Sequence, residues 1–231
     1  MALRRRASAS GIAPGQLRDE GDGLAHRLIT AALGEAYPQD PVLSEEGVDD
    51  PIRLRSRRVW IVDPLDGTRE FGDPRSGDWA VHVALVVDGI PVAAAVSLPP
   101  RGLVLSTEPS VPQPRAADQS PRMVVSRTRA PAIATSVAER LGAELVPMGS
   151  AGAKSMAVVL GEADIYLHAG GQYEWDSAAP VAVALAGGLH ASRIDGSPLR
   201  YNRPDPWMPD QLICRPELAE SILRLVGSRT S

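Results

Sequence analysis

The sequence RVWIVDPLDGT, residues 58–68, joins a short apolar run to a turn that carries two carboxylates. The apolar run before Asp63 predicts a buried strand. Pro64 fixes its own φ and lacks a backbone N–H, so we expect it to end the strand. Gly67 permits a tight turn and a close backbone approach. The segment therefore predicts a strand followed by a turn that presents Asp63 and Asp66 together.

The residue types in this turn suit a divalent metal ion and a phosphate. Asp63, Asp66 and the Leu65 carbonyl would be aimed at one point, and ligands that are all oxygen suit Mg²⁺ rather than Zn²⁺. The chain that leaves through Thr68 can begin a helix, whose free N–H groups suit a phosphate. Pro, Asp and Gly are also ordinary residues of surface turns, so the segment alone leaves that interpretation open.

Three further motifs carry groups that the same chemistry needs, and each also has an ordinary structural interpretation. They are the pair Glu45-Glu46 in LSEEG (residues 43–47), Glu174-Trp175-Asp176 at the start of an Ala-rich helix, and GSAGAK (residues 149–154), which ends in the only lysine of the chain, Lys154. Exposed Glu pairs are usually solvated, an Asp at a helix start is usually a cap, and Gly-rich loops are common. The third motif is not a P-loop, which requires Gly-Lys-Ser/Thr.

The spacing of the two Asp residues excludes one other class of phosphatase. Haloacid-dehalogenase-type phosphatases use Asp-x-Asp-Gly-Thr, in which the first Asp is the nucleophile. Here Pro64 stands two positions before Asp66 and offers no nucleophile. A phospho-aspartyl route on this motif is therefore ruled out.

Composition and charge argue against several classes of partner. The net charge of −4 does not suit a nucleic acid or an anionic membrane surface, which call for a basic face. No apolar stretch approaches the ~20 residues of a membrane span, and the basic start of the chain lacks the apolar region of a secretory signal. The single cysteine, Cys214, permits no disulfide within the chain. We therefore expect a cytoplasmic protein with neither a nucleic-acid partner nor a membrane span.

The order of the apolar runs predicts an α/β protein in two halves. Helical periodicity predicts a first helix over residues 23–37, with Asp22 as its N-cap. Strands are expected over 79–87, 90–98 and 103–107, and the second half alternates strands with helices, which is typical of α/β layering. The expected organisation is a poorly ordered or truncated N-terminus over 1–21, a metal-binding half over 22–110, a linker over 111–121 and an α/β half over 122–231.

Together, DPLDGT at residues 63–68, the Glu pair upstream and Trp175-Asp176 downstream resemble the inositol-monophosphatase-like superfamily. Within it, the segments 126–127, 149–154 and 163–166 are most similar to the CysQ branch. That branch removes the 3′-phosphate of 3′-phosphoadenosine 5′-phosphate, a by-product of sulfate assimilation. The resemblance implies a layered αβαβα sandwich, inhibition by lithium, a small phosphorylated metabolite as substrate and frequent homodimers.

The resemblance also implies two to three Mg²⁺ ions per active site. One would be held by Glu45, Asp63 and the Leu65 carbonyl. Asp63, Asp66 and Asp176 would hold a second, and a third, weaker ion would share Glu45. These assignments come from matching motif positions and not from the spacing of the residues.

Catalytic and substrate-binding roles follow from the same resemblance. Asp22, Thr68 and Glu45 would be the catalytic residues, with Asp22 and Thr68 orienting the attacking water. The amides of Gly67 and Thr68 would bind the scissile phosphate. The substrate contacts would come from Asp66, Gly67, Thr68, Ser126, Arg127, Ser150, Lys154, Glu174 and Asp176.

Two departures from the family pattern bear on these expectations. Only 21 residues precede Asp22, and they do not read as the first long helix of the family, so we expect a truncated or misassigned start. Ala151 stands where relatives have a Ser three positions before the Lys. An inositol-phosphate or fructose-1,6-bisphosphate phosphatase remains the alternative. A non-catalytic protein that binds a phosphorylated metabolite is an alternative of another class.

Overall fold

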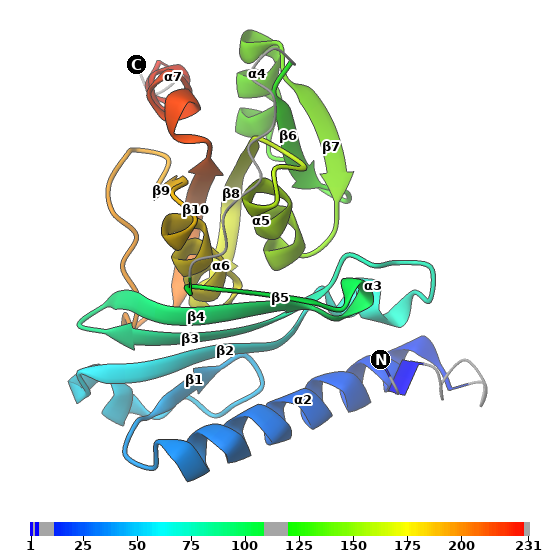
Figure 1. Ribbon diagram of the computed structural model, residues 1–231, viewed down its shortest axis with the longest axis vertical. Coiled ribbons are helices and arrows are strands. Elements are labelled where there is room, and N and C mark those ends of the chain that lie inside the picture. The colour runs from blue at the N-terminus through cyan, green and yellow to red at the C-terminus, as the bar shows by residue number, and fades with distance from the viewer. Residues whose placement is uncertain (2, 5–11, 109–119, 229–231) are drawn as a thin grey trace.

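The computed structural model describes residues 1, 3–4, 12–108 and 120–228, which form five layers. The layers are a helix, a sheet, two helices, a second sheet and two further helices (Figure 1). This αβαβα arrangement confirms the fold class that the sequence resemblance implies. Most of the predicted linker over 111–121 lies outside the described residues.

The first sheet carries the DPLDGT segment and has the strand order β1-β2-β3-β4-β5. Its strands are β1 (Val42–Ser44), β2 (Arg58–Asp66), β3 (Ala80–Val87), β4 (Ile90–Leu98) and β5 (Leu103–Ser106). β1 runs parallel to β2, and the other neighbours are antiparallel. The outer helix is α2 (Pro14–Ala36), and three short helices lie between strands, namely η1 (Pro51–Arg55), α3 (Thr68–Gly72) and η2 (Pro99–Arg101).

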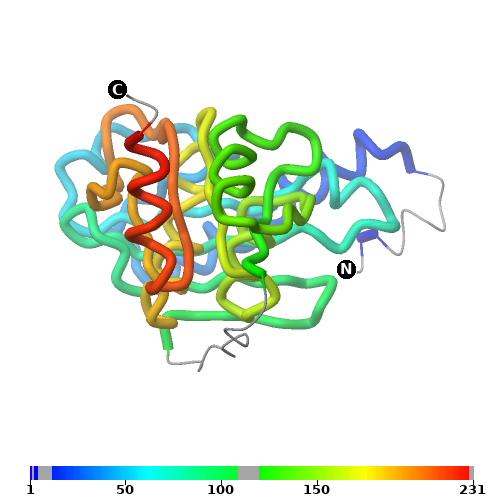
Figure 2. Tube along the Cα trace, turned by 90° about the horizontal axis from the view of Figure 1, so that it is seen from above, coloured from blue at the N-terminus to red at the C-terminus, as the bar shows by residue number. Residues whose placement is uncertain are grey.

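The second sheet has the strand order β7-β6-β8-β10-β9. Its strands are β6 (Arg122–Ser126), β7 (Glu144–Met148), β8 (Ile165–Tyr173), β9 (His190–Ser192) and β10 (Trp207–Cys214). Seen from above, α4 (Ala132–Leu141) and α7 (Pro216–Gly227) cover its outer face next to each other (Figure 2). The middle layer consists of α5 (Ala151–Val159) and α6 (Glu174–Ala186).

The middle layer is stable only between the two sheets, because α5 and α6 are apolar on nearly every side. Met156 and Val158 of α5 and Val181 of α6 are at most 2% exposed. They belong to one core cluster with residues of the first sheet such as Val96. A helix that is apolar all round has to be buried all round. Packing of this layer brings the first turns of both helices to the end of β2.

Two sequence predictions about the elements next to the turn are wrong. Helix α2 begins at Pro14 rather than at residue 23, so Asp22 lies inside the helix and does not cap it. A proline at the first helical position loses no hydrogen bond, which allows this earlier start. Strand β2 continues through Pro64 to Asp66, because the register of its pairing with β3 shifts at this point. A bulge tolerates a residue that has no N–H to donate.

The strands expected over 79–87, 90–98 and 103–107 are present as β3, β4 and β5, and β4 has the expected ends. β8 reaches Tyr173 through Gly170 and Gly171, which both have positive φ. The short strands β1 and β9 and the helix α7 were not predicted. In the described part of the chain, no helix is both long and apolar enough to cross a membrane.

Candidate metal and phosphate site

A bulge at the end of β2 turns Asp63 and Asp66 to the same face of the first sheet. Asp63 pairs with His82 of β3 and Asp66 pairs with Ala80, so three steps along β2 match two steps along β3. Residues three apart in a regular strand point to opposite faces, and the extra residue removes this difference. Gly67 follows with a φ of 86°, which lets the chain leave the sheet and begin α3.

Asp176 joins these two residues in a group of three carboxylates. One oxygen of each lies within 4.8 Å of the others. Asp176 occupies the first turn of α6, where its Oδ2 accepts a hydrogen bond of 2.7 Å from the backbone N–H of Tyr173. The structure therefore brings together the three Asp residues that the sequence resemblance assigns to one metal ion.

Asp66 is held by the first turn of α5. Its Oδ1 accepts a bond of 3.1 Å from the Ala151 N–H, and its Oδ2 accepts bonds from the Gly152 N–H, at 2.5 Å, and from the Ser150 hydroxyl. Burial alone would raise the pKa of Asp66, but contact with His82 and these donors outweigh it and lower the pKa to about 2. Asp66 is thus an anion fixed in position by the protein itself.

The other carboxylates lack comparable support, and their pKa values are raised. Burial and the charges of Asp66 and Glu45 raise the pKa of Asp63 well above its ordinary value. Burial and Asp66 raise the pKa of Asp176 to about 6. For Glu45, burial together with Asp176 and Asp22 raises the pKa to about 7. Like charges therefore crowd this site, and a cation would relieve their repulsion.

The residues present fit a hard divalent cation. The donors are all oxygen atoms, and Oδ2 of Asp63 is buried with no hydrogen-bond partner. Glu45 is an exposed residue and is not one of the three clustered Asp residues, but the charges of Asp176 and Asp66 act on its carboxyl group. The Leu65 carbonyl accepts a bond of 3.2 Å from the Thr68 hydroxyl, which leaves a second lone pair of that oxygen available.

Asp22 approaches the cluster from α2. It is 7% exposed, and its Oδ1 is buried without a hydrogen-bond partner. Burial and the charges of Glu46 and Asp19 raise the pKa of Asp22 to about 7. Its charge in turn acts on Glu45. An acidic group with a pKa near neutrality at this position is able to accept a proton from water.

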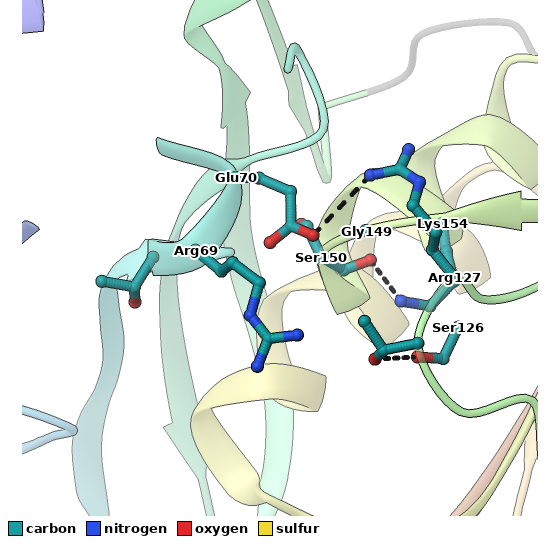
Figure 3. A pocket seen from close by; sticks show the side chains of 9 residues that line it. Arg69, Glu70, Ser126, Arg127, Gly149, Ser150 and Lys154 are labelled. Atoms are coloured by element: carbon teal, nitrogen blue, oxygen red, sulfur yellow. Dashed lines mark hydrogen bonds and ion pairs between the residues drawn. The ribbon is translucent and has the colours of Figure 1, made fainter. Parts of the chain in front are cut away.

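A cationic pocket adjoins the cluster, lined by Thr68, Arg69, Glu70, Ser126, Arg127, Thr128, Gly149, Ser150 and Lys154 (Figure 3). Arg69 and Glu70 come from α3, Arg127 follows β6, and Lys154 comes from α5. Its lining includes three basic side chains, those of Arg69, Arg127 and Lys154, and one carboxylate, that of Glu70. The pocket therefore suits an anionic group next to the carboxylate cluster.

Lys154 is buried rather than solvated. It is 6% exposed, and its Nζ donates a hydrogen bond of 2.6 Å to the Ser150 carbonyl (Figure 3). The ammonium also lies 5.2 Å from the ring centroid of Tyr166. Burial lowers the pKa of Lys154, and the surrounding carboxylates act in the opposite direction. Lys154 is therefore not a solvated surface lysine.

Ser126 and Arg127 form the opposite wall of the pocket. Arg127 makes an ion pair with Asp78 and a longer one, of 3.8 Å, with Glu70. The Ser126 hydroxyl lies 3.3 Å from that of Thr128. Ser126 is the last residue of β6 and Arg127 follows it, and both line the pocket.

Glu174 does not line this pocket, which corrects its assignment as a substrate contact. It is 0% exposed, and its two carboxylate oxygens accept bonds of 2.6 Å and 2.9 Å from the backbone N–H groups of Asn202 and Arg203. With both oxygens engaged, Glu174 holds the loop before β10 in place.

The sequence analysis missed His82, which is fully buried beside the cluster. Its Nδ1 lies 3.0 Å from the Trp175 carbonyl oxygen, and its Nε2 lies 3.3 Å from Oδ2 of Asp66. Burial alone would lower the pKa of His82, but the contact with Asp66 outweighs this and raises it. A lone histidine in an otherwise apolar strand was the signal available in the sequence.

The sequence model of the inositol monophosphatase family matches residues 13–231. The chain belongs to the inositol monophosphatase family. A family member from Mycobacterium bovis, named 3′-phosphoadenosine 5′-phosphate phosphatase, is 50% identical over 98% of this chain and 88% of its own length.

Two solved structures of the inositol monophosphatase family share the fold. CysQ from Bacteroides thetaiotaomicron superimposes with a TM-score of 0.70 at 30% identity, covering 84% of this chain and 83% of its own. Inositol monophosphatase II from Staphylococcus aureus reaches a TM-score of 0.78 at 21% identity, covering 95% and 88%. The CysQ structure extends the CysQ resemblance of the sequence to the three-dimensional structure. The staphylococcal structure, at 21% identity, shows the fold alone.

Proposed function

We propose that this chain is a Mg²⁺-dependent phosphomonoesterase that hydrolyses 3′-phosphoadenosine 5′-phosphate to AMP and phosphate. The observation that carries the proposal is the carboxylate cluster of Asp63, Asp66 and Asp176 beside a pocket with three basic side chains. The name of the 50% identical mycobacterial relative supports the choice of substrate. This reaction would remove a by-product of sulfate assimilation.

The carboxylate cluster would hold two Mg²⁺ ions, with a third bound more weakly at Glu45. Glu45, Asp63 and the Leu65 carbonyl would hold the first ion. Asp63, Asp66 and Asp176 would hold the second. When bound, such ions lower the pKa of a water and neutralise the charge of the entering and leaving oxygens.

The protein groups around the cluster would position the reactants. Asp22, with its pKa of about 7, would accept a proton from the attacking water, and the Thr68 hydroxyl would help to orient that water. The backbone N–H groups of Gly67 and Thr68 would hold the scissile phosphate. Direct attack by water on phosphorus requires no covalent intermediate, so positioning and charge stabilisation would supply most of the rate enhancement.

The second phosphate of the substrate would occupy the cationic pocket. Lys154 and Arg127 would bind it as charge partners, and the Ser126 and Ser150 hydroxyls would add hydrogen bonds. A monophosphate has no group for this pocket. The pocket therefore favours a bisphosphate over a monophosphate.

A phosphate-release assay over a panel of substrates tests the proposal. The panel contains 3′-phosphoadenosine 5′-phosphate, inositol 1-phosphate and fructose 1,6-bisphosphate, each with Mg²⁺, with EDTA and with Mg²⁺ plus lithium. We expect the highest kcat/KM on the nucleotide, no turnover with EDTA and inhibition by lithium. A higher kcat/KM on inositol 1-phosphate or fructose 1,6-bisphosphate would overturn the choice of substrate. Binding without turnover on every substrate would make the chain a binding protein.

A further inference from the structure

His82 sits where four elements meet. It belongs to β3, directly opposite Asp63 of β2, and its side chain points to the middle layer. Nδ1 lies 3.0 Å from the carbonyl oxygen of Trp175, the residue before Asp176 in α6. Nε2 lies 3.3 Å from Oδ2 of Asp66, within the distance of an ion pair, although it makes no hydrogen bond. One ring therefore touches Asp66 and the backbone next to Asp176.

We propose that His82 is a positioning residue, which fixes Asp66 relative to the start of α6 and thereby sets the affinity of the site for divalent cations. The inference rests on the metal site under "Proposed function" and adds to it a residue that is not itself a ligand. Residues that orient metal ligands contribute to affinity because they hold the ligands in place before the ion binds.

Gly152 supports this role. A Cβ atom at this position would lie 2.0 Å from Nε2 of His82 and 3.0 Å from Cβ of Ala80. The same residue donates its backbone N–H to Oδ2 of Asp66. The start of α5 thus leaves room for the imidazole. The Gly152 N–H and Nε2 of His82 both lie next to the same oxygen, Oδ2 of Asp66.

The alternative is that His82 merely fills the core. Burying an imidazole without polar partners is unfavourable, and an apolar residue would fill the same volume without that cost. A carbonyl oxygen only accepts hydrogen bonds, so Nδ1 is the donor toward Trp175. The other ring nitrogen faces the carboxylate of Asp66. One ring nitrogen therefore faces Asp66, and the other faces the backbone next to Asp176.

Two substitutions separate the two contacts. In His82→Asn, the amide nitrogen replaces Nδ1 and keeps the bond to Trp175, but nothing reaches Asp66. In His82→Gln, the longer side chain places its amide nitrogen near the position of Nε2. Val96→Ala is the matched control, because Val96 lies opposite His82 on β4, is 0% exposed, and touches no carboxylate of the cluster by hydrogen bond or ion pair. Its truncation lowers stability through packing alone.

The measurement is calorimetric titration of Mg²⁺ into the metal-free full-length protein, with thermal unfolding in EDTA alongside. We expect His82→Asn to raise the Kd for Mg²⁺ by about ten-fold, the lower end of the range for residues that orient metal ligands. His82→Gln should recover most of the affinity. Val96→Ala should lower Tm and leave the Kd unchanged.

Three results would overturn the inference. They are an unchanged Kd in His82→Asn, a loss in His82→Gln as large as in His82→Asn, and an equal loss in Val96→Ala. If His82→Asn does not fold, His82→Gln is compared with Val96→Ala. A higher Kd for Mg²⁺ in Val96→Ala but not in His82→Gln would show that packing sets the affinity, and would overturn the inference. A wild-type protein that binds no Mg²⁺ would overturn the metal site itself. Binding of Mg²⁺ without hydrolysis of the nucleotide would contradict only the proposed substrate.

Discussion

At the scale of single residues, Asp63 and Asp66 differ in the hydrogen bonds that their carboxylate oxygens accept. Oδ1 of Asp63 accepts one bond of 3.0 Å from the Leu65 N–H, and its Oδ2 has no partner. Both oxygens of Asp66 accept bonds from the start of α5. Substitution of the two residues by Asn should therefore have different effects on stability.

Asp66→Asn should destabilise the metal-free protein, whereas Asp63→Asn should not. An amide at position 66 turns its NH₂ toward a donor, which leaves a buried donor unsatisfied at a cost of about 1–3 kcal/mol. An amide at position 63 can keep the Leu65 bond, and its NH₂ would replace an oxygen that already lacks a partner, so no existing hydrogen bond is lost. Both variants should lose nearly all turnover, since each lacks an anionic ligand. Urea unfolding in EDTA, paired with phosphate release in Mg²⁺, measures both effects, and equal stabilities would contradict the expectation.

Lys154→Met should raise KM for a bisphosphate substrate by roughly ten-fold, because a charge-assisted contact contributes about 1.5–3 kcal/mol. The methionine fills a similar volume in this buried position, so the fold should be retained. Monophosphates, which do not reach this pocket, should be affected much less. Arg140→Met is the control, because Arg140 lies far from the site in a groove between α4 and α7. Equal losses on both substrate classes would place Lys154 at the scissile phosphate instead.

At the scale of elements, the contact between α2 and α3 sets the position of Asp22. Gly21 lies against Phe71 of α3, and a Cβ at Gly21 would come within 2.6 Å of the Phe71 ring. The close approach of the two helices therefore depends on a residue without a side chain. Asp22 follows directly and is carried to the cluster by that contact.

Gly21→Ala should lower both stability and activity, although alanine favours helices by about 1 kcal/mol over glycine. The added methyl would push α2 away from Phe71 and move Asp22. Gly34→Ala is the control in the same helix, since no atom lies within 4 Å of a Cβ at Gly34, and it should raise stability by about 0.5–1 kcal/mol. The two melting temperatures and the two kcat values test this, and a stabilised Gly21→Ala would refute it.

The sequence predicted most elements of this region but not their geometry. The apolar run of β2 and the motif DPLDGT are local, so both could be read directly. The bulge could not, because it depends on the pairing of Asp63 and Asp66 with residues of β3. The sequence analysis predicted Asp22 as an N-cap because acidic residues favour that position. The part of α2 that precedes Asp22 has little apolar periodicity, so the sequence did not reveal that the helix begins earlier. Its burial is decided by tertiary packing.

At the scale of the whole molecule, Arg53 connects the two halves. It is 1% exposed and pairs with Asp49 by two bonds, of 2.5 Å and 2.8 Å. The same guanidinium donates to the Asn202 side chain at 3.0 Å and to the Arg203 carbonyl at 2.8 Å. These partners lie in the loop that Glu174 also holds. A segment after β1 is thereby fastened to a segment before β10.

The Asp49–Arg53 pair should make stability depend on acid pH. The hydrogen bond from Arg53 lowers the pKa of Asp49 below its ordinary value. A lowered pKa in the folded state contributes stability above the unfolded value of about 3.9, and this contribution is lost as the pH falls through the folded value. Asp49→Asn should therefore be less stable than wild type at pH 7, by on the order of 1 kcal/mol because Asp49 is half exposed.

Urea midpoints of wild type and Asp49→Asn between pH 7 and pH 3 measure this dependence. The difference between them should stay constant down to about pH 5 and shrink below about pH 4. Asp88→Asn is the control, because its pair with Arg57 is exposed on both sides and should contribute little. A difference that grew toward acid pH would contradict the sign of the effect.

The layered arrangement of the whole chain could not be predicted from local sequence patterns. Alternation of strands and helices predicted α/β layering, while the five layers came from the family resemblance. The strand order β7-β6-β8-β10-β9 joins residues far apart in the chain, and no local pattern specifies such pairings. The ties through Arg53 and Glu174 also depend on that long-range order. Lone polar residues such as His82 acquire their partners only after the layers have closed.

The position of Asp66 at the start of α5 has a consequence for the order of events during synthesis. A ribosome-bound chain that has emerged only as far as β5 contains Asp63 and Asp66, but it lacks the donors that fix Asp66. It also lacks Asp176, which arrives with α6. Such a nascent chain contains the residues proposed for the first ion, but only two of the three Asp residues proposed for the second. Under the proposed function, the site for the second ion would be complete only after α5 and α6 have emerged, and a translation product interrupted before α6 would lack it.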